Sequence, residues 1–188
     1  LVVRMCGWTL LRVPVHRSRA DLYLENGAVL VRGETIAAIG NSDDMIRRYP
    51  DEPCLDAGGR VVMPGFVDPH THLVWVGDRA AEFEMRLEGA SYEEVARAGG
   101  GIVSTVKATR AATDDMLLAA ALPRVDAMLA EGVAVIEVKS GYGLDLETEF
   151  RQLEAVLEIN KAGPIELVPT YMGAHAIPVE FKGDTAGY

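Results

Sequence analysis

The sequence predicts an α/β protein, and more specifically the first part of a (β/α)8 barrel that follows a small β-subdomain. Short strand-like runs separated by turn residues lie at 21–40 within an N-terminal part of residues 1–60, whereas strand-like and helix-like segments alternate over residues 61–188. Such alternation favours a parallel sheet with right-handed crossovers, which is found in doubly wound sheets and in barrels. Polar residues directly after three successive strand-like runs favour the barrel, because barrel enzymes build their sites there.

Composition indicates a globular protein that acts on a small molecule. The 188 residues are 49% hydrophobic and carry a net charge of −10, so a nucleic-acid surface is not expected. No apolar run approaches the roughly 18 residues of a membrane span. The two cysteines, Cys6 and Cys54, lie far apart and give neither a disulfide framework nor a thiolate zinc site, which favours the reducing cytoplasm.

The β-subdomain is expected to contain three short strands, at 22–24, 28–31 and 35–39. Asn26-Gly27 between the first two predicts a type I′ hairpin, because both residues tolerate positive φ. A second turn is expected at 32–34, and a short helix at 43–49 before Pro50 and Pro53. Residues 1–19 fit this pattern poorly: they are apolar but interrupted, so a signal peptide is not expected. The initial Leu1 suggests that upstream sequence is missing.

The second part is expected to alternate between strands and helices. A buried strand is predicted at 60–68, a short helix at 92–98 with a Ser91/Glu94 capping box, and a helix from Thr113 to Gly132. Leu118, Leu122, Val125 and Leu129 repeat at helical spacing in it, and Pro123 should kink it or mark its start. A parallel strand covered on both faces is predicted at 133–138, and a further strand at 165–170. Between them, a helix capped by Asp145 presents one apolar face: Leu146, Phe150, Leu153 and Leu157.

The residues after these strands carry the chemistry. His70 and His72 follow the first strand, and imidazoles two apart on an extended segment point to the same side and can reach one cation. Two histidines are fewer than the roughly three protein ligands of a catalytic metal site, so His-x-His alone leaves surface or hydrogen-bonded histidines as an alternative. Tyr142 follows the second strand and His175 the third.

The segment from Val62 to His72, VMPGFVDPHTH, resembles the first barrel strand of the amidohydrolase superfamily. Within it, the motifs GDRA at 77–80, GASY at 89–92, AGGGI at 98–102, KSGYGL at 139–144 and GAHA at 173–176 are similar to those of imidazolonepropionases. The resemblance runs from about residue 20 to the last residue. It implies a (β/α)8 barrel of the metal-dependent hydrolase type after a β-sandwich subdomain, with a domain boundary at residue 60.

The resemblance also implies a function: hydrolysis of the ring amide of 4-imidazolone-5-propanoate to N-formimino-L-glutamate, in histidine degradation. His70 and His72 would be two ligands of one zinc or iron ion, and Arg79, Tyr142, His175 and Tyr92 would contact the substrate. His175 could also stabilise the developing oxyanion. The remaining ligands and the general base would come from later strands, so the chain would end before its barrel is complete and would be inactive alone. A homodimer is compatible with the resemblance.

Several other interpretations stay open at this point. Arg79 stands beside Asp78, Glu82 and Glu84, and without the resemblance a solvated ion pair is the better interpretation. Tyr142 and His175 could be loop-packing residues, and Lys139 invites comparison with the carboxylated lysine of dinuclear amidohydrolases, although the resemblance makes it structural. The substrate could instead be another cyclic amide or a nucleobase, and the chain could be an inactive truncated product.

Overall fold

We describe the chain from a computed structural model, which describes residues 2–4, 8–10, 23–33 and 35–188. The chain divides into two compact units, Leu1–Pro64 and Gly65–Tyr188. The segment 1–19 is described only at 2–4 and 8–10, so the expectations for Cys6 and for most of that segment lie outside the described residues. Within the described part, no helix is both long and apolar enough to cross a bilayer.

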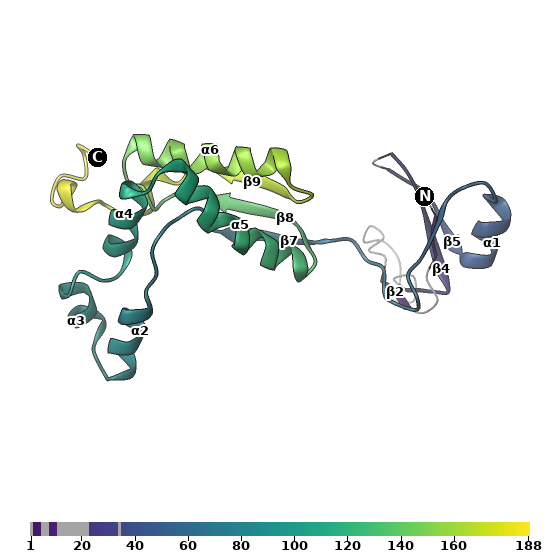
Figure 1. The fold of residues 1–188 in the computed structure, drawn as a ribbon, viewed down its shortest axis with the longest axis horizontal. Coiled ribbons are helices and arrows are strands. Elements are labelled where there is room, and N and C mark those ends of the chain that lie inside the picture. Colours follow the sequence, from purple (N-terminus) through teal and green to yellow (C-terminus); the bar gives the residue numbers. More distant parts are fainter. Residues whose placement is uncertain (1, 5–7, 11–22, 34) are drawn as a thin grey trace. The chain divides into compact units, whose positions relative to one another are not determined.

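The first unit contains two small sheets (Figure 1). A four-stranded mixed sheet has the order β5-β4-β1-β6, in which β1 pairs antiparallel with β4 and parallel with β6. A two-stranded antiparallel sheet pairs β2 with β3. The strands are β1 (Val2–Arg4), β2 (Trp8–Leu10), β3 (Tyr23–Glu25), β4 (Gly27–Arg32), β5 (Thr35–Asn41) and β6 (Cys54–Asp56).

The turn predicted at 32–34 joins two paired strands and is confirmed, whereas the hairpin predicted at Asn26-Gly27 is wrong. β4 and β5 pair antiparallel from Arg32 opposite Thr35, with Gly33 at φ 60° in the turn. Asn26 does adopt a positive φ of 49°, but it joins β3 to β4, which lie in different sheets. Gly27 is already the first residue of β4, so the backbone turns at one residue only and no type I′ hairpin forms there.

Helix α1 (Ser42–Arg48) follows β5 directly and closes the small core of this unit. The Asn41 side chain caps it by accepting a hydrogen bond from the Asp43 N–H. Ala28 and Leu30 of β4 pack with Met45 of α1, and all three are buried. The helix predicted at 43–49 is therefore present, one residue earlier.

The second unit is built on a parallel sheet of order β7-β8-β9, namely β7 (Phe66–Thr71), β8 (Val133–Lys139) and β9 (Glu166–Thr170) (Figure 1). The connection from β7 to β8 contains four helices: α2 (Ala80–Leu87), α3 (Tyr92–Arg97), α4 (Ile102–Ala111) and α5 (Asp114–Ala130). Helix α6 (Leu146–Ala162) connects β8 to β9, and two 3-10 turns follow at Gly173–His175 (η2) and Val179–Phe181 (η3). Helices α2 and α4 have no counterpart among the segments predicted from the sequence.

The helix boundaries follow local capping chemistry. Ser91 and Glu94 form the predicted capping box of α3, and Gly101, at φ 78°, precedes α4. Thr113 caps α5, and Asp145 caps α6 by accepting from the Thr148 N–H. Pro123 neither starts nor ends α5, which continues through it as one 17-residue helix.

The first strand of this sheet departs from the sequence prediction. Residues 60–65 are not a strand, and β7 extends through Pro69 and His70 to Thr71. Its side chains are also not buried: Phe66 is 52% and Val67 62% exposed. β7 lies at an edge of the three-stranded sheet, and no described element covers the face on which Val67 lies opposite Val135.

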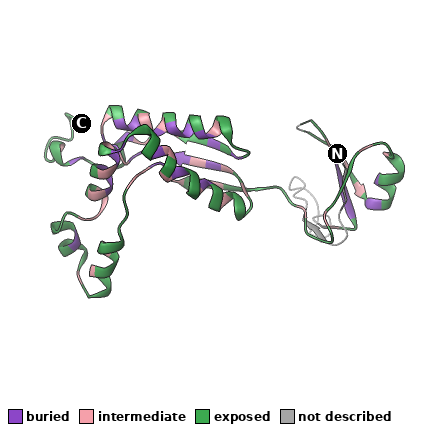
Figure 2. Cartoon of the chain, viewed as in Figure 1, coloured by how far each residue is buried: buried purple, intermediate pink, exposed green. Residues whose placement is uncertain are grey.

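The hydrophobic core lies on one face of the sheet only. Ile136 and Val138 of β8 and Leu167 of β9 are buried against α5 and α6. The intervening residues of β8, Val133, Val135 and Glu137, are only half-buried. The expectation of a strand covered on both faces is therefore wrong within the described residues. Figure 2 colours the residues of this unit by their burial.

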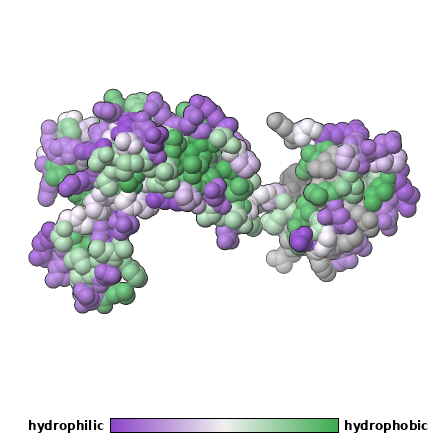
Figure 3. Space-filling view, in the orientation of Figure 1, coloured by the Kyte–Doolittle hydropathy of each residue, from purple (hydrophilic) through white to green (hydrophobic). Residues whose placement is uncertain are grey.

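The predicted apolar face of α5 is only partly confirmed, since Val125 is buried and Leu118 packs against the core, and that of α6 is wrong for most of its residues. α5 buries Leu117, Ala121 and Val125, whereas Leu122 and Leu129 are exposed. α6 buries six other residues, namely Thr148, Glu149, Gln152, Ala155, Val156 and Ile159. Its predicted face remains largely open, since Leu146, Phe150 and Leu157 are exposed. Figure 3 shows apolar side chains gathered on the surface of this unit.

Candidate active site

The residues predicted to carry the chemistry lie at one edge of the three-stranded sheet. His70 is in β7, His72 directly follows it, Tyr142 lies in the loop after β8, and His175 ends η2 after β9. The strands are parallel, so their C-terminal ends meet at this edge. We call these four residues the ring cluster.

The rings of the cluster are in mutual contact. The His72 and His175 imidazoles stack with centroids 4.7 Å apart, and the Tyr142 ring lies 5.0 Å from His72 and 5.5 Å from His175. His70 is the outer member, with its ring centroid 6.1 Å from that of His72. The His-x-His spacing thus brings two imidazoles near each other, and the loops after β8 and β9 add two further rings.

Gly141 allows the loops after β8 and β9 to approach each other closely. Its φ is 115°, and an added Cβ would lie 2.8 Å from the His175 side chain. The Gly141 carbonyl is 3.0 Å from His175 Nδ1, which fixes the orientation of that ring. A side chain at this position would displace His175 from His72.

His72 occupies a distinct electrostatic environment in the cluster. Burial lowers the pKa of His72 below its usual 6.5, and positive charge on His175, His70 or Lys139 acts in the same direction, while the Ser140 backbone opposes it. Its Nδ1 atom is buried and has no hydrogen-bond partner among the described residues. A neutral imidazole with an unpartnered nitrogen is suited to coordinate a cation.

The lowered pKa of His72 makes the stability of the metal-free protein depend on pH. Because the folded-state pKa lies below the unfolded-state value, the unfolded chain binds more protons as the pH falls through 6.5. This contribution is therefore complete above pH 6.5 and is lost below it. We expect urea unfolding with a chelator present to give a free energy that falls from pH 7.5 to 5.5, and to fall less in His72→Asn. An equal pH dependence in both proteins would contradict this.

Two adjoining cavities connect the ring cluster to α2, α3 and α4. One, of about 290 Å³, is lined by Tyr142 and His175 together with Arg79 and Tyr92. The other, of about 340 Å³, is lined by His72, Tyr142 and Arg79, and also by Trp75 and Thr105. Of the predicted site residues, only His70 lines neither cavity.

Arg79, which precedes α2, makes no ion pair with its acidic neighbours. Its Nε and Nη2 atoms donate to the Thr105 hydroxyl of α4 at 3.1 and 3.0 Å. None of the ion pairs within the described part of the chain involves Arg79. The guanidinium therefore keeps donors that can pair with both oxygens of a carboxylate in the cavity. The alternative of a solvated ion pair does not describe this structure.

The loop that carries Tyr142 is held by two charged side chains. Buried Glu149 of α6 accepts hydrogen bonds at Oε1 from the N–H groups of Gly143 and Leu144, both at 2.8 Å. Arg110 of α4 donates to the carbonyls of the same two residues. Leu144 has φ 54°, a conformation that L-residues adopt at a cost of about 1–2 kcal/mol, so these contacts hold a strained turn.

Lys139 is engaged within the sheet and does not line either cavity. Its Nζ lies 2.5 Å from Glu137 Oε2 on the same strand, and Thr170 of β9 donates to Glu137 Oε1 at 2.7 Å. The hydrogen bond from Lys139 is the largest cause that lowers the pKa of Glu137. This arrangement agrees with a structural role for Lys139.

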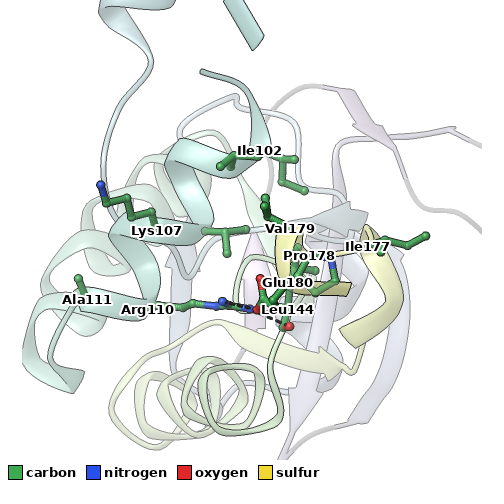
Figure 4. A pocket seen from close by; sticks show the side chains of 11 residues that line it. Ile102, Lys107, Arg110, Ala111, Leu144, Ile177, Pro178, Val179 and Glu180 are labelled. Atoms are coloured by element: carbon green, nitrogen blue, oxygen red, sulfur yellow. Dashed lines mark hydrogen bonds and ion pairs between the residues drawn. The ribbon is translucent and has the colours of Figure 1, made fainter. Parts of the chain in front are cut away.

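A larger cavity, of about 450 Å³, lies between α4 and residues 177–180 (Figure 4). It is lined mainly by apolar side chains, among them Val106, Leu144 and Val179. None of the predicted site residues contributes to it, and Arg110 at its edge is paired with Asp145 and Glu180. Since none of the predicted site residues lines this cavity, we assign the candidate site to the ring cluster and its two cavities.

Comparison with known proteins shows which families the chain resembles. A model described as "Amidohydrolase family" matches residues 54–140, and one described as "Imidazolonepropionase-like composite domain, bacteria" matches residues 27–51. The imidazolonepropionase of Roseobacter denitrificans is 55% identical over 182 residues, which are 96% of this chain and 46% of that protein. By sequence, the chain is a relative of the imidazolonepropionases. That of Paracoccus denitrificans is 53% identical over 165 residues, 88% of this chain and 41% of its own length.

The chain therefore spans less than half the length of these imidazolonepropionases. Among solved structures, guanine deaminase from Bradyrhizobium japonicum aligns with a TM-score of 0.57 and A. niger ochratoxinase with 0.53, each at 16% identity. Each alignment covers 90% of this chain, and 34% and 30% of the respective structure. At this identity the two structures indicate a shared fold.

Trp75 and Thr105 are site residues that sequence reasoning missed. Trp75 lies three residues after His72, and its ring is 6.3 Å from Tyr142. An aromatic residue so close to a predicted metal ligand could have indicated that Trp75 lines the site. Nothing in the sequence indicates the same for Thr105, because α4 was not predicted and Thr105 is far from Arg79 along the chain.

Proposed function

We propose that the whole protein hydrolyses the ring amide C–N bond of 4-imidazolone-5-propanoate to N-formimino-L-glutamate, a step in histidine degradation. The observation that carries this proposal is the cavity in which Arg79, with free donors, faces the same space as His72 and Tyr142. It would place a carboxylate at the guanidinium and a ring amide near the imidazoles. Identity above 50% to imidazolonepropionases supports the same substrate.

The reaction would use one zinc or iron ion, and the residues present fit part of such a site. His70 and His72 supply two neighbouring imidazoles, and His72 has a buried nitrogen without a partner. Within the described residues, no group of three or more His, Cys, Asp or Glu side chains is arranged to hold a metal. The remaining ligands would therefore come from outside this part of the chain. When bound, the metal would lower the pKa of a water and polarise the ring carbonyl.

The other site residues would bind and orient the substrate. Arg79 would pair with the propanoate carboxylate, positioned by its hydrogen bonds to Thr105. Tyr142 and His175 would hydrogen-bond the ring, with the His175 orientation fixed by Gly141, and His175 could stabilise the developing oxyanion. Tyr92 would contribute at the outer end of the cavity, where its side chain is 81% exposed. The general base is not among these residues.

The half-covered sheet supports a finer proposal about the fold. Residues 65–188 would be the first part of a (β/α)8 barrel, whose later strands would cover Val67, Val135 and Val168. The exposed stripe of α6 would then pack against a following helix. The first unit would be the β-sandwich subdomain, and we place the whole protein, as a homodimer, in the cytoplasm. A truncated, inactive product remains the alternative for the 188-residue chain itself.

Replacing Arg79 tests the substrate assignment. In the full-length protein, we expect Arg79→Ala to raise KM for 4-imidazolone-5-propanoate by about 10- to 100-fold, because it removes a charge-assisted pair of about 1.5–3 kcal/mol. Thr105→Val, which keeps the guanidinium but removes its anchor, should give a smaller increase. Steady-state kinetics would measure both. Arg97→Ala, in the last turn of α3, serves as the matched control.

The same variant separates the two substrate classes. A neutral cyclic amide or a nucleobase has no carboxylate for Arg79, so an enzyme for such a substrate would keep its KM in Arg79→Ala. Metal-loaded full-length protein that does not consume 4-imidazolone-5-propanoate would overturn the proposal altogether.

A further inference from the structure

The segment that follows β7 is fastened by side chains at nearly every residue. The indole Nε1 of Trp75 donates to the His72 carbonyl at 3.0 Å. Nη1 of Arg124, on α5, donates to the carbonyls of Leu73 and Trp75 at 2.7 and 2.9 Å, and Gln152 Nε2 of α6 donates to the Val74 carbonyl at 2.6 Å. Four successive carbonyls, from residue 72 to 75, thus accept hydrogen bonds from side chains. These hydrogen bonds take the place of the backbone hydrogen bonds of a regular strand.

Arg124 is central to this arrangement because it makes two kinds of contact. Besides donating to two carbonyls, its guanidinium carbon lies 3.8 Å from the centroid of the Trp75 ring, within the range of a cation–π contact. None of the ion pairs of the described residues contains Arg124, although its side chain is half-buried. The cost of burying the Arg124 guanidinium is therefore offset by its hydrogen bonds to the carbonyls of residues 73 and 75 and by its contact with the indole ring.

We propose that Arg124 is a positioning residue for His72 and acts through Trp75. The guanidinium fixes the Trp75 ring, and the indole N–H of that ring fixes the His72 carbonyl, so the imidazole is held with Nδ1 unpartnered beside the cavity. The same contact holds Trp75 against Tyr142 in the cavity wall. As far as it concerns metal binding, this inference rests on the proposed function.

Two measurements on the full-length protein test the inference. One is the Zn²⁺ affinity, measured by calorimetry, and the other is the position of the His72 imidazole resonances in ¹H–¹⁵N spectra of the metal-free form. Arg124→Met keeps an unbranched apolar stem but removes the guanidinium and with it both kinds of contact. We expect it to shift the His72 resonances and to weaken Zn²⁺ binding by about 10-fold or more, the loss typical of residues that orient a metal ligand. Trp75→Phe, which removes the indole N–H that donates to the His72 carbonyl together with part of the ring beneath Arg124, should shift the same resonances at least as much.

Arg151→Met is the matched control for lost stability. Arg151 lies on α6 and anchors the N-terminus of α5 through Ala112 and Asp114, without contact to residues 72–75. It should lower the melting temperature but leave Zn²⁺ affinity within about 2-fold, a small fraction of the expected loss. Unchanged His72 resonances in Arg124→Met, or equal effects of both variants on Zn²⁺ affinity, would overturn the inference. If the unaltered protein bound no Zn²⁺ through His70 and His72, the proposed function would fail, while the resonances would still decide the positioning role.

Discussion

Replacing His72 with alanine in the full-length protein is expected to lower kcat/KM on the order of 10³-fold or more, because loss of a metal ligand removes several kcal/mol of transition-state stabilisation. The variant should also lose bound metal. His72 is the imidazole whose Nδ1 is buried without a partner, so its removal takes away the best-prepared ligand of the described residues. Metal content by atomic absorption, measured beside steady-state kinetics, tests both effects.

His175→Ala is the informative comparison for this result. His175 stacks on His72 but is assigned a substrate contact, so its variant should keep its metal and lose activity. A His72→Ala protein with one tightly bound metal per chain and near-normal kcat/KM would show that the ring cluster is not a metal site.

The sequence predicted those parts of the fold that depend on local chemistry. The caps at Ser91, Thr113 and Asp145 were identified correctly because each cap is satisfied within three residues. The hairpin at Asn26-Gly27 was not, because strand pairing depends on residues distant in the sequence, here Val2–Arg4 opposite Ala28–Leu30. The spacing of apolar residues misled the choice of face on α6, which buries the polar side chains Glu149 and Gln152 and exposes Phe150.

The candidate site was more predictable than the fold around it. Each ring of the cluster belongs to a short motif at the end of a strand, and parallel strands end at one edge whatever the rest of the sheet does. The contacts that hold these motifs could not be read from the sequence. Arg124 is 51 residues from Leu73, and Gln152 is 78 residues from Val74, and no local pattern links either pair.

Glu149 is the supporting residue whose loss should affect folding most. Glu149→Leu fills the same space but leaves the N–H groups of Gly143 and Leu144 without their acceptor. Each buried, unsatisfied N–H costs about 1–3 kcal/mol, so we expect the free energy of unfolding to fall by about 3 kcal/mol or more. The positive φ of Leu144 would add to the loss, because that strained turn would then be held from one side only, by Arg110.

Glu149→Gln separates the hydrogen bonds from the charge. The amide oxygen can still accept from both N–H groups, so this variant should lose about 1 kcal/mol or less, the scale of replacing a charged acceptor by a neutral one. Urea unfolding of the three proteins, followed by circular dichroism, would give the difference. If the leucine variant were as stable as the glutamine variant, the loop after β8 would hold its shape without Glu149, and the position of Tyr142 would have to be attributed to Arg110 and the glycines alone.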